Sequence, residues 1–273
     1  MKSILTALVL LLVGQNALAK ESTLTISVDK KEKIFSRTQL LAMPGKRTLK
    51  IDYDPAYPGM TMNYVAVPAA EVFKDIPLSE ESTILFKCSD GFSAPLSKNR
   101  MLATGANESK AYIAIEDPHK PWPKLKDGRS IGPFYLVWLE PMKSAIGQEE
   151  WPFMLSGFEV KSSVEETFPL TVPAGADETV SRGYKLFQKN CFACHTLNGQ
   201  GASSFGPDLN SPMSVTEYFS AEALRSFIRD PQTVRKWPQA KMKGFSKEML
   251  SETDLDSLLE YLTHMADTRP PAK

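Results

Sequence analysis

The sequence is poor in the two residue types that most often bind metals. Its 273 residues include only three cysteines and three histidines. Cys191 and Cys194 are separated by two residues, whereas Cys88 lies far from both. A structural zinc site needs a second pair of cysteine or histidine ligands at metal spacing, and the sequence offers none. A thioredoxin-like redox pair needs a preceding strand in a βαβ unit, and this context is missing as well.

Net charge is also lacking. Lys and Arg number 32 and Asp and Glu number 32, so the formal net charge is zero. A chain that binds nucleic acid or an anionic membrane over a wide surface needs an excess of positive charge. We therefore expect no nucleic-acid partner, and contact with a membrane only if the N-terminal segment is retained.

Long apolar runs are absent beyond the first residues of the chain. Met1-Lys2 is a short positive start, Ile4–Val13 is apolar, and Ala17–Ala19 has the small residues of a cleavage site. The run is short for a bilayer span. We expect a signal peptide over residues 1–19, cleaved after Ala19, and a periplasmic protein. The alternative is an uncleaved membrane anchor.

The most informative stretch of the chain is Cys191-Phe192-Ala193-Cys194-His195. Two cysteines at this spacing, followed at once by histidine, are the attachment signature of c-type haem. Both thiols can reach the vinyl groups of one porphyrin, and the imidazole is then aimed at the iron. The chain has one such motif, which predicts one covalent haem. Haem attachment of this kind takes place outside the bacterial cytoplasm, in agreement with export.

Residues 20–165 alternate short apolar segments with turn residues, which indicates an α+β or mainly β domain. Thr23–Val28 alternates polar and apolar residues as a half-buried strand does. Ser36 is placed to cap a short helix through Leu41, and a second short helix is expected from Ala69 to Lys74. Further strands are expected at Thr48–Tyr53, Thr83–Cys88, Ala111–Ile115, Phe134–Leu139 and Met154–Val160.

Three segments of this region resemble the sulfite-oxidase-type molybdopterin-binding fold. They are Tyr64–Phe73, Cys88–Phe92 and Gly132–Trp138. In that family the cysteine that ligates molybdenum lies upstream of the short helix, and this chain has no cysteine before Cys88. The resemblance therefore implies a related fold that lacks molybdopterin.

Residues 166–176 are rich in proline and have no clear periodicity, so we expect an extended linker there. Residues 177–273 are expected to be all-helical. Asp177 can cap a helix whose apolar stripe includes Gly183, and Ser251 can cap a helix that contains Tyr261. A glycine facing an aromatic residue would allow these two helices to cross closely. A third helix is expected at Ala221–Arg229.

This C-terminal region resembles a monohaem class I cytochrome c over almost its whole length. The matching segments are Gly183 and Phe187, Cys191–His195, Asn198–Gly201, Gly206–Leu209, Ile228–Pro231, Lys241–Phe245 and the final Leu-rich helix. The resemblance implies that His195 is one axial ligand of the iron and that the carbonyl of Pro207 accepts a hydrogen bond from its other ring nitrogen. It also implies that Met242 is the second axial ligand, although Lys243 replaces the usual proline after it.

Other residues could supply that second ligand. They are Met213, Met249, Met265 and His264. A thioether opposite an imidazole raises the reduction potential and closes both axial positions. We therefore expect an electron carrier rather than an enzyme. The alternatives are a haem-containing subunit or fusion of a molybdenum-dependent oxidoreductase, a haem peroxidase and a haem-based sensor.

Four basic residues bracket Met242. They are Arg235, Lys236, Lys241 and Lys243. In the cytochrome fold this loop borders the exposed edge of the haem, so we expect a basic docking face for an acidic redox protein. An ordinary solvated loop is the alternative interpretation of the same charges.

Overall fold

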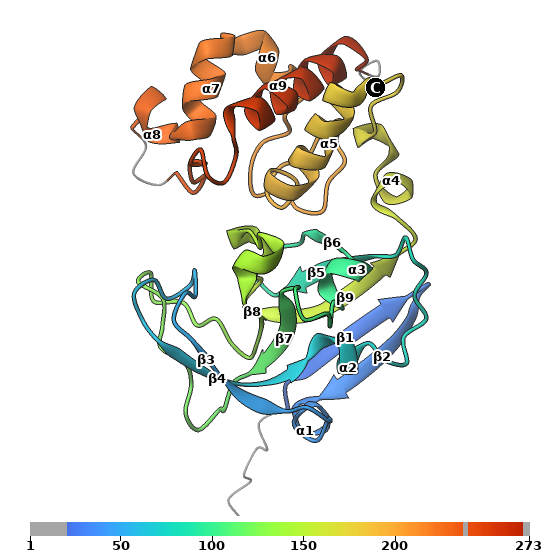
Figure 1. Cartoon of the computed structure of the whole chain (residues 1–273), viewed down its shortest axis with the longest axis vertical. Helices are drawn as coiled ribbons and strands as arrows, with labels where there is room; N and C mark the ends of the chain where they lie inside the picture. The colour runs from blue at the N-terminus through green and yellow to red at the C-terminus, as the bar shows by residue number, and fades with distance from the viewer. Residues whose placement is uncertain (1–20, 237–239, 270–273) are drawn as a thin grey trace, which may run out of the picture.

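The computed structural model describes residues 21–236 and 240–269. The expected signal peptide, residues 1–19, lies outside the described residues. The described chain forms a sheet-rich N-terminal domain and a helical C-terminal domain, drawn below and above in Figure 1. None of the described helices is long and apolar enough to span a bilayer.

The N-terminal domain contains two sheets. The first has the order β2-β1-β9-β5-β6, formed by Lys31–Ser36, Thr23–Val28, Leu155–Lys161, Thr83–Cys88 and Pro95–Ser97. The second has the order β3-β4-β7-β8, formed by Arg47–Ile51, Met62–Pro68, Lys110–Ile115 and Phe134–Leu139. The β1–β9 pair is parallel and the other pairs are antiparallel.

Short helices connect these strands. They are α1 (Arg37–Leu41), α2 (Ala69–Val72), α3 (Lys98–Met101), and the 3₁₀ turns η1 (Pro141–Ser144) and η2 (Gln148–Glu150). The Ser36 hydroxyl accepts a hydrogen bond from the backbone amide of Gln39, and the Gln39 side chain accepts one from the backbone amide of Ser36. Two backbone donors at the start of α1 are thereby satisfied. The predicted cap at Ser36 is therefore confirmed.

One apolar core joins the two sheets of the N-terminal domain. Phe158 of β9 packs edge-on against Phe73, with ring centroids 5.1 Å apart. Asp54 is buried in this core, and its carboxylate accepts hydrogen bonds from the hydroxyls of Tyr64 and Tyr135. Burial of a carboxylate is tolerated because these donors replace water.

The stretch predicted as an extended linker is ordered against the helical domain. It includes the end of α4 (Val164–Thr167) and the whole of η3 (Pro169–Thr171). The ring of Phe168 packs on Phe192, with centroids 4.9 Å apart, and the hydroxyl of Tyr261 donates to the Thr171 carbonyl at 2.6 Å. These contacts were not visible in the sequence because they depend on partners more than twenty residues away.

The helical domain contains α5 (Glu178–Asn190), α6 (Val215–Tyr218), α7 (Ala221–Arg229), α8 (Pro231–Val234) and α9 (Glu252–Asp267). The first and last of these cross closely, as predicted. A Cβ at Gly183 of α5 would lie 2.0 Å from the Ser257 carbonyl oxygen and 2.6 Å from the Cβ of Tyr261. Only glycine fits at this crossing.

Candidate functional site

The Cys191–His195 motif forms a helical turn at the end of α5. Cys191 is the C-cap of that helix. The backbone N–H groups of Cys194 and His195 both donate to the Cys191 carbonyl, at 3.0 and 2.9 Å. Residues three and four positions apart share one face of a helical turn. Both thiols and the imidazole therefore leave the backbone on the same side.

The two thiols of the motif are free of disulfide bonds. Burial raises the pKa of Cys191 to about 12. Burial raises the pKa of Cys194 to about 11, and the nearby negative charge of Glu149 contributes a smaller part of this increase. Both groups are therefore protonated thiols at neutral pH, available to add S–H across an alkene.

The ring of His195 is held in one orientation and one tautomer. Its Nδ1 lies 2.8 Å from the carbonyl oxygen of Pro207. A carbonyl can only accept, so Nδ1 carries the proton and Nε2 keeps its lone pair. Burial lowers the pKa of His195, which favours the neutral ring. A neutral imidazole with a free Nε2 lone pair is the form that binds iron.

A glycine next to Pro207 provides the space that this ring needs. The N–H of Gly206 donates to the Cys194 carbonyl at 2.7 Å. A Cβ at Gly206 would lie 2.4 Å from Cε1 of His195, well inside van der Waals contact. The loop can therefore bring its carbonyl to Nδ1 only because position 206 has no side chain.

Asp208 organises the loop that carries Pro207. Its carboxylate accepts hydrogen bonds from the Thr196 hydroxyl and from the backbone amides of Asn198, Gly199, Asn210 and Ser211. Burial raises the pKa of Asp208, but these donors outweigh it and the net pKa lies below the usual value. One carboxylate thus ties the chain on both sides of Pro207, at residues 196–199 and at residues 210–211.

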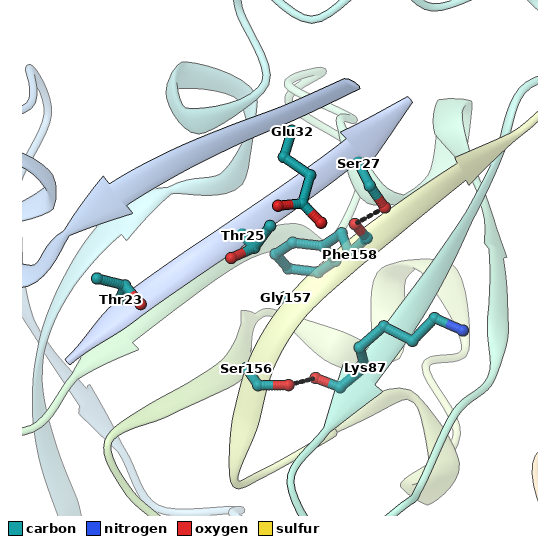
Figure 2. Close-up of a pocket in the computed structure, with 8 residues that line it drawn as sticks. All are labelled: Thr23, Thr25, Ser27, Glu32, Lys87, Ser156, Gly157 and Phe158. Atoms are coloured by element: carbon teal, nitrogen blue, oxygen red, sulfur yellow. Dashed lines mark hydrogen bonds between the residues drawn. The ribbon is translucent and has the colours of Figure 1, made fainter. Parts of the chain in front are cut away.

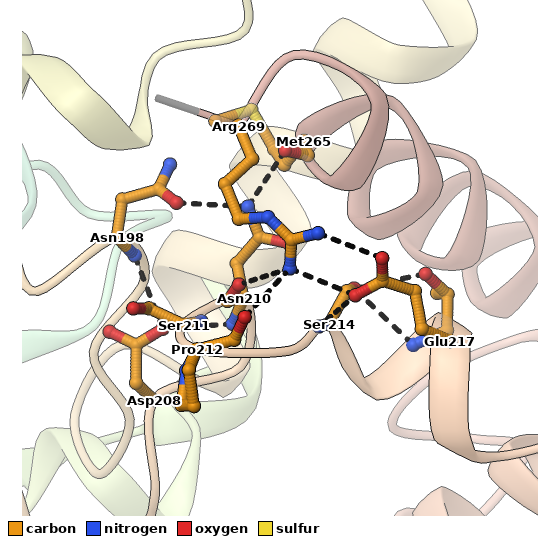
Figure 3. A network of polar contacts seen from close by, with 10 residues as sticks. Asn198, Asp208, Asn210, Ser211, Pro212, Ser214, Glu217, Met265 and Arg269 are labelled. Atoms are coloured by element: carbon orange, nitrogen blue, oxygen red, sulfur yellow. Dashed lines mark hydrogen bonds and ion pairs between the residues drawn. The ribbon is translucent and has the colours of Figure 1, made fainter. Parts of the chain in front are cut away.

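The same loop is fastened to the end of α9, as Figure 3 shows. The Arg269 guanidinium donates to the Asn210 carbonyl at 2.9 Å and pairs with the Glu217 carboxylate at 2.8 Å. The Asn210 side chain donates to the Met265 carbonyl at 2.7 Å. These bonds connect the loop that holds His195 to α6 and α9.

Met242 is half-buried in the segment that precedes α9. Residues 237–239, just before it, lie outside the described residues. The segment is anchored after Met242, since the Phe245 amide donates to the Ile228 carbonyl at 3.0 Å. A Cβ at Gly244 would lie 2.0 Å from the Arg229 carbonyl oxygen, so the chain passes against α7 there.

The other candidate ligands have different surroundings. Met265 is buried in the apolar core of the helical domain, and Nε2 of His264 lies 2.9 Å from the Ala174 carbonyl. The side chains of Met213 and Met249 are 53% and 44% exposed. Two of the four are therefore engaged elsewhere and two are largely exposed.

The basic residues around Met242 are all exposed, but two of them face the N-terminal domain. Nζ of Lys243 donates to the side-chain oxygen of Gln148 in η2 at 3.0 Å. The charge of Lys241 helps lower the pKa of Asp127, after the hydrogen bonds from Arg129. The structure therefore divides the predicted docking face. Lys241 and Lys243 lie toward the N-terminal domain, whereas Arg235 and Lys236 directly follow α8.

A shallow groove on the five-stranded sheet is lined by Thr25 and Ser27 of β1, Glu32, Lys87 and Phe158 (Figure 2). The hydroxyl of Ser27 in this groove is already engaged with the backbone, since its Oγ donates to the Phe158 carbonyl at 3.3 Å. No residue of the Cys191–His195 motif lines this groove.

Cys88 is remote from the motif in sequence. Burial raises the pKa of its thiol well above the usual range, so it is an unreactive core thiol.

Residues 180–266 match the family model for cytochrome c. The C-terminal region contains a cytochrome c domain. The match extends from within α5 to near the end of α9 and includes the motif, the Pro207 loop and Met242. This family implies covalently bound haem c and haem-based electron transfer. No curated protein and no solved structure matches the chain, so the sulfite-oxidase resemblance of the N-terminal domain has no support from these comparisons.

The residues present fit haem c. Two protonated thiols and a neutral imidazole share one face of a turn, and Gly206 leaves room for the imidazole. Sequence reasoning identified these residues but missed Asp208 as the organising carboxylate. A Pro-Asp pair followed by Asn210 and Ser211 is a signal for such a turn, because aspartate commonly accepts from amides two and three residues on.

Proposed function

We propose that the protein is a periplasmic electron carrier with one haem c attached through Cys191 and Cys194. His195 and Met242 are the axial ligands in this proposal. The observation that carries it is the His195 ring, neutral and fixed by Pro207 on the face that also presents both thiols. The bound haem supplies one-electron exchange between ferrous and ferric iron.

The chain's own residues perform three tasks around this group. Cys191 and Cys194 would hold the haem through two thioethers, each formed by adding S–H across one vinyl group, so that the thiol proton would pass to carbon and nothing would leave. Pro207 holds the proton of Nδ1 and so directs Nε2 to the metal. Met242 would hold the iron through its thioether, and a second protein ligand of this kind would favour electron transfer over catalysis.

Location and partners are part of the proposal. The apolar start of the sequence and the haem motif both support export to the periplasm. We propose that donor and acceptor are redox proteins that approach the exposed stretch around Arg235 and Lys236, where opposite charge would speed encounter. Lys243 is directed to Gln148 of the same chain.

The attachment residues can be tested with cysteine variants. The chain would be produced with a c-type haem maturation system and its haem identified by the pyridine haemochrome spectrum. Cys191→Ala and Cys194→Ala should each leave one vinyl group unsaturated and shift that spectrum, and the double variant should lose covalent haem. Cys88→Ala is the control and should keep the wild-type spectrum. Covalent haem in the double variant would overturn the assignment.

The assignment of Met242 needs a separate comparison. Met242→Ala should remove the methionine–iron charge-transfer band of the oxidised protein and lower the reduction potential, because a thioether favours the ferrous state. Met249→Ala and Met213→Ala are the controls and should change neither. Retention of the band in Met242→Ala, or its loss in a control, would assign the ligand elsewhere.

A further inference from the structure

The face of the cytochrome c domain that presents the haem motif lies against the N-terminal domain. Ala193 is only 3% exposed, and its neighbours belong to the apolar core of the N-terminal domain rather than to that of the helices. Cys194 packs against the same core. Figure 1 shows the segment that includes η2 directed toward the helical domain.

The covering surface has two parts. Phe92, in the turn after β5, meets Phe205 of the helical domain with ring centroids 6.2 Å apart. Ile146 and Phe153 flank η2 and pack with the same apolar core as Cys194. We call these four residues, with Gln148, the interdomain seal. Phe205 directly precedes the Gly206-Pro207 pair that contacts His195, so the seal reaches the haem-binding loop itself.

Charges on the two sides of the seal are complementary. Glu149 of η2 is half-buried, and its charge acts on Cys194. Burial raises the pKa of Glu149 and the charge of Lys243 opposes this effect. Lys243 also donates to Gln148. The basic loop after Met242 therefore faces an acidic residue of its own chain.

The N-terminal side of the seal is held rigidly. The Arg100 guanidinium forms two bonds to the Glu150 carboxylate and a third, at 3.0 Å, to the Ala145 carbonyl. The Trp138 indole donates to the Glu150 carbonyl at 2.7 Å. A surface preorganised in this way loses little conformational entropy when another domain packs on it.

We propose that the N-terminal domain is the resident partner of the haem, sealing the porphyrin edge that carries the Cys194 thioether, so that external partners reach the haem from another side. The inference rests on the proposed attachment at Cys194, because a thioether fixes that edge within a bond of Sγ. Excluding water from a haem edge disfavours the more highly charged ferric state and raises the reduction potential.

The seal can be opened from either domain with neutral substitutions. In the full-length holoprotein, Phe92→Ser and Phe205→Ser should each lower the reduction potential and increase amide hydrogen exchange at residues 146–153. Both substitutions remove the same Phe92–Phe205 contact. The reduction potential of the double variant should therefore fall no further than that of the single variant with the larger effect. Tyr218→Ser is the matched control, because Tyr218 and Phe205 are both 51% exposed, and it should change neither quantity.

The outcomes separate this inference from the proposed function. Haem content is measured first, and a wild-type chain without covalent haem would overturn the proposed function. A holoprotein whose potential and exchange do not respond to Phe92→Ser, or whose two single effects simply add, would overturn the seal alone. Phe92 lies outside the cytochrome c domain, so its variant carries the test even if Phe205→Ser impairs haem attachment.

Discussion

Gly206 lies directly against the imidazole ring of His195. A Cβ at this position would be 2.4 Å from Cε1 and 2.6 Å from Nδ1. The neighbouring Pro207 carbonyl is 2.8 Å from the same Nδ1. The absence of a side chain at position 206 is thus a condition for the hydrogen bond that orients the ring.

Gly206→Ala should therefore displace either the ring or the loop. We expect a loss of roughly 1–3 kcal/mol in unfolding free energy, as for other overpacked sites, and a changed Soret spectrum. Chemical denaturation followed by haem absorption measures both. Gly147→Ala is the control, because a Cβ there meets its nearest atom at an ordinary 3.6 Å. Equal behaviour of the two variants would contradict the proposed packing.

Asp208→Asn should weaken the helical domain in a pH-dependent way. The folded-state pKa of Asp208 lies below the ordinary 3.8, so its contribution to stability is present above that value and is lost as pH falls through the lowered pKa. The wild-type and variant unfolding free energies should therefore differ at neutral pH and converge in acid. Denaturation at a series of pH values measures the difference. A difference that stays constant down to acid pH for Asp208→Asn would contradict this role of the carboxylate.

Gly183→Ala should disturb the crossing of α5 and α9. The new Cβ would meet the Ser257 carbonyl, which is backbone and cannot rotate away. We expect a loss of about 2–3 kcal/mol in the unfolding free energy of the helical domain. Lys185→Ala, at an exposed position of the same helix, should change stability by less than about 0.5 kcal/mol. Thermal unfolding measures the stability of both variants, and equal losses would contradict a close crossing of α5 and α9.

Arg100→Ala should destabilise the N-terminal domain. It leaves the buried carboxylate of Glu150 without two of its donors, and we expect a cost of roughly 2–4 kcal/mol. Lys98→Ala removes a pair with Glu80, whose side chain is 81% exposed, and should cost less than about 1 kcal/mol. Denaturation followed by tryptophan fluorescence measures both. Similar losses in the two variants would show that the Glu150 bonds contribute little.

Much of the secondary structure could be predicted because its signals are local. Thr83–Cys88 and Phe134–Leu139 form strands with the predicted bounds, and Ala221–Arg229 forms the predicted helix. Strand β2, the three-residue strand β6 and the start of β4, at Met62–Tyr64, were missed. The residues of β2 are mostly charged or polar, and those of β6 are too few to show alternation.

The motif could be found from the sequence because the attachment chemistry requires fixed spacing. The Phe92–Phe205 contact could not be found in the same way. Phe92 and Phe205 lie in turns of different domains, and their meeting depends on how the domains pack. The ordered conformation of residues 166–176 likewise depends on distant partners, such as Phe192 and Tyr261.

The absorption spectrum of the matured full-length protein, recorded with iron and molybdenum analysis on the same sample, shows whether the chain holds a closed electron-transfer haem. We expect one iron and one covalent haem per chain. We also expect a low-spin spectrum with the methionine–iron charge-transfer band in the oxidised state. A chain that matures without covalent haem, or a high-spin spectrum, would contradict a closed electron-transfer haem at His195 and Met242. Stoichiometric molybdenum would contradict the electron-carrier function.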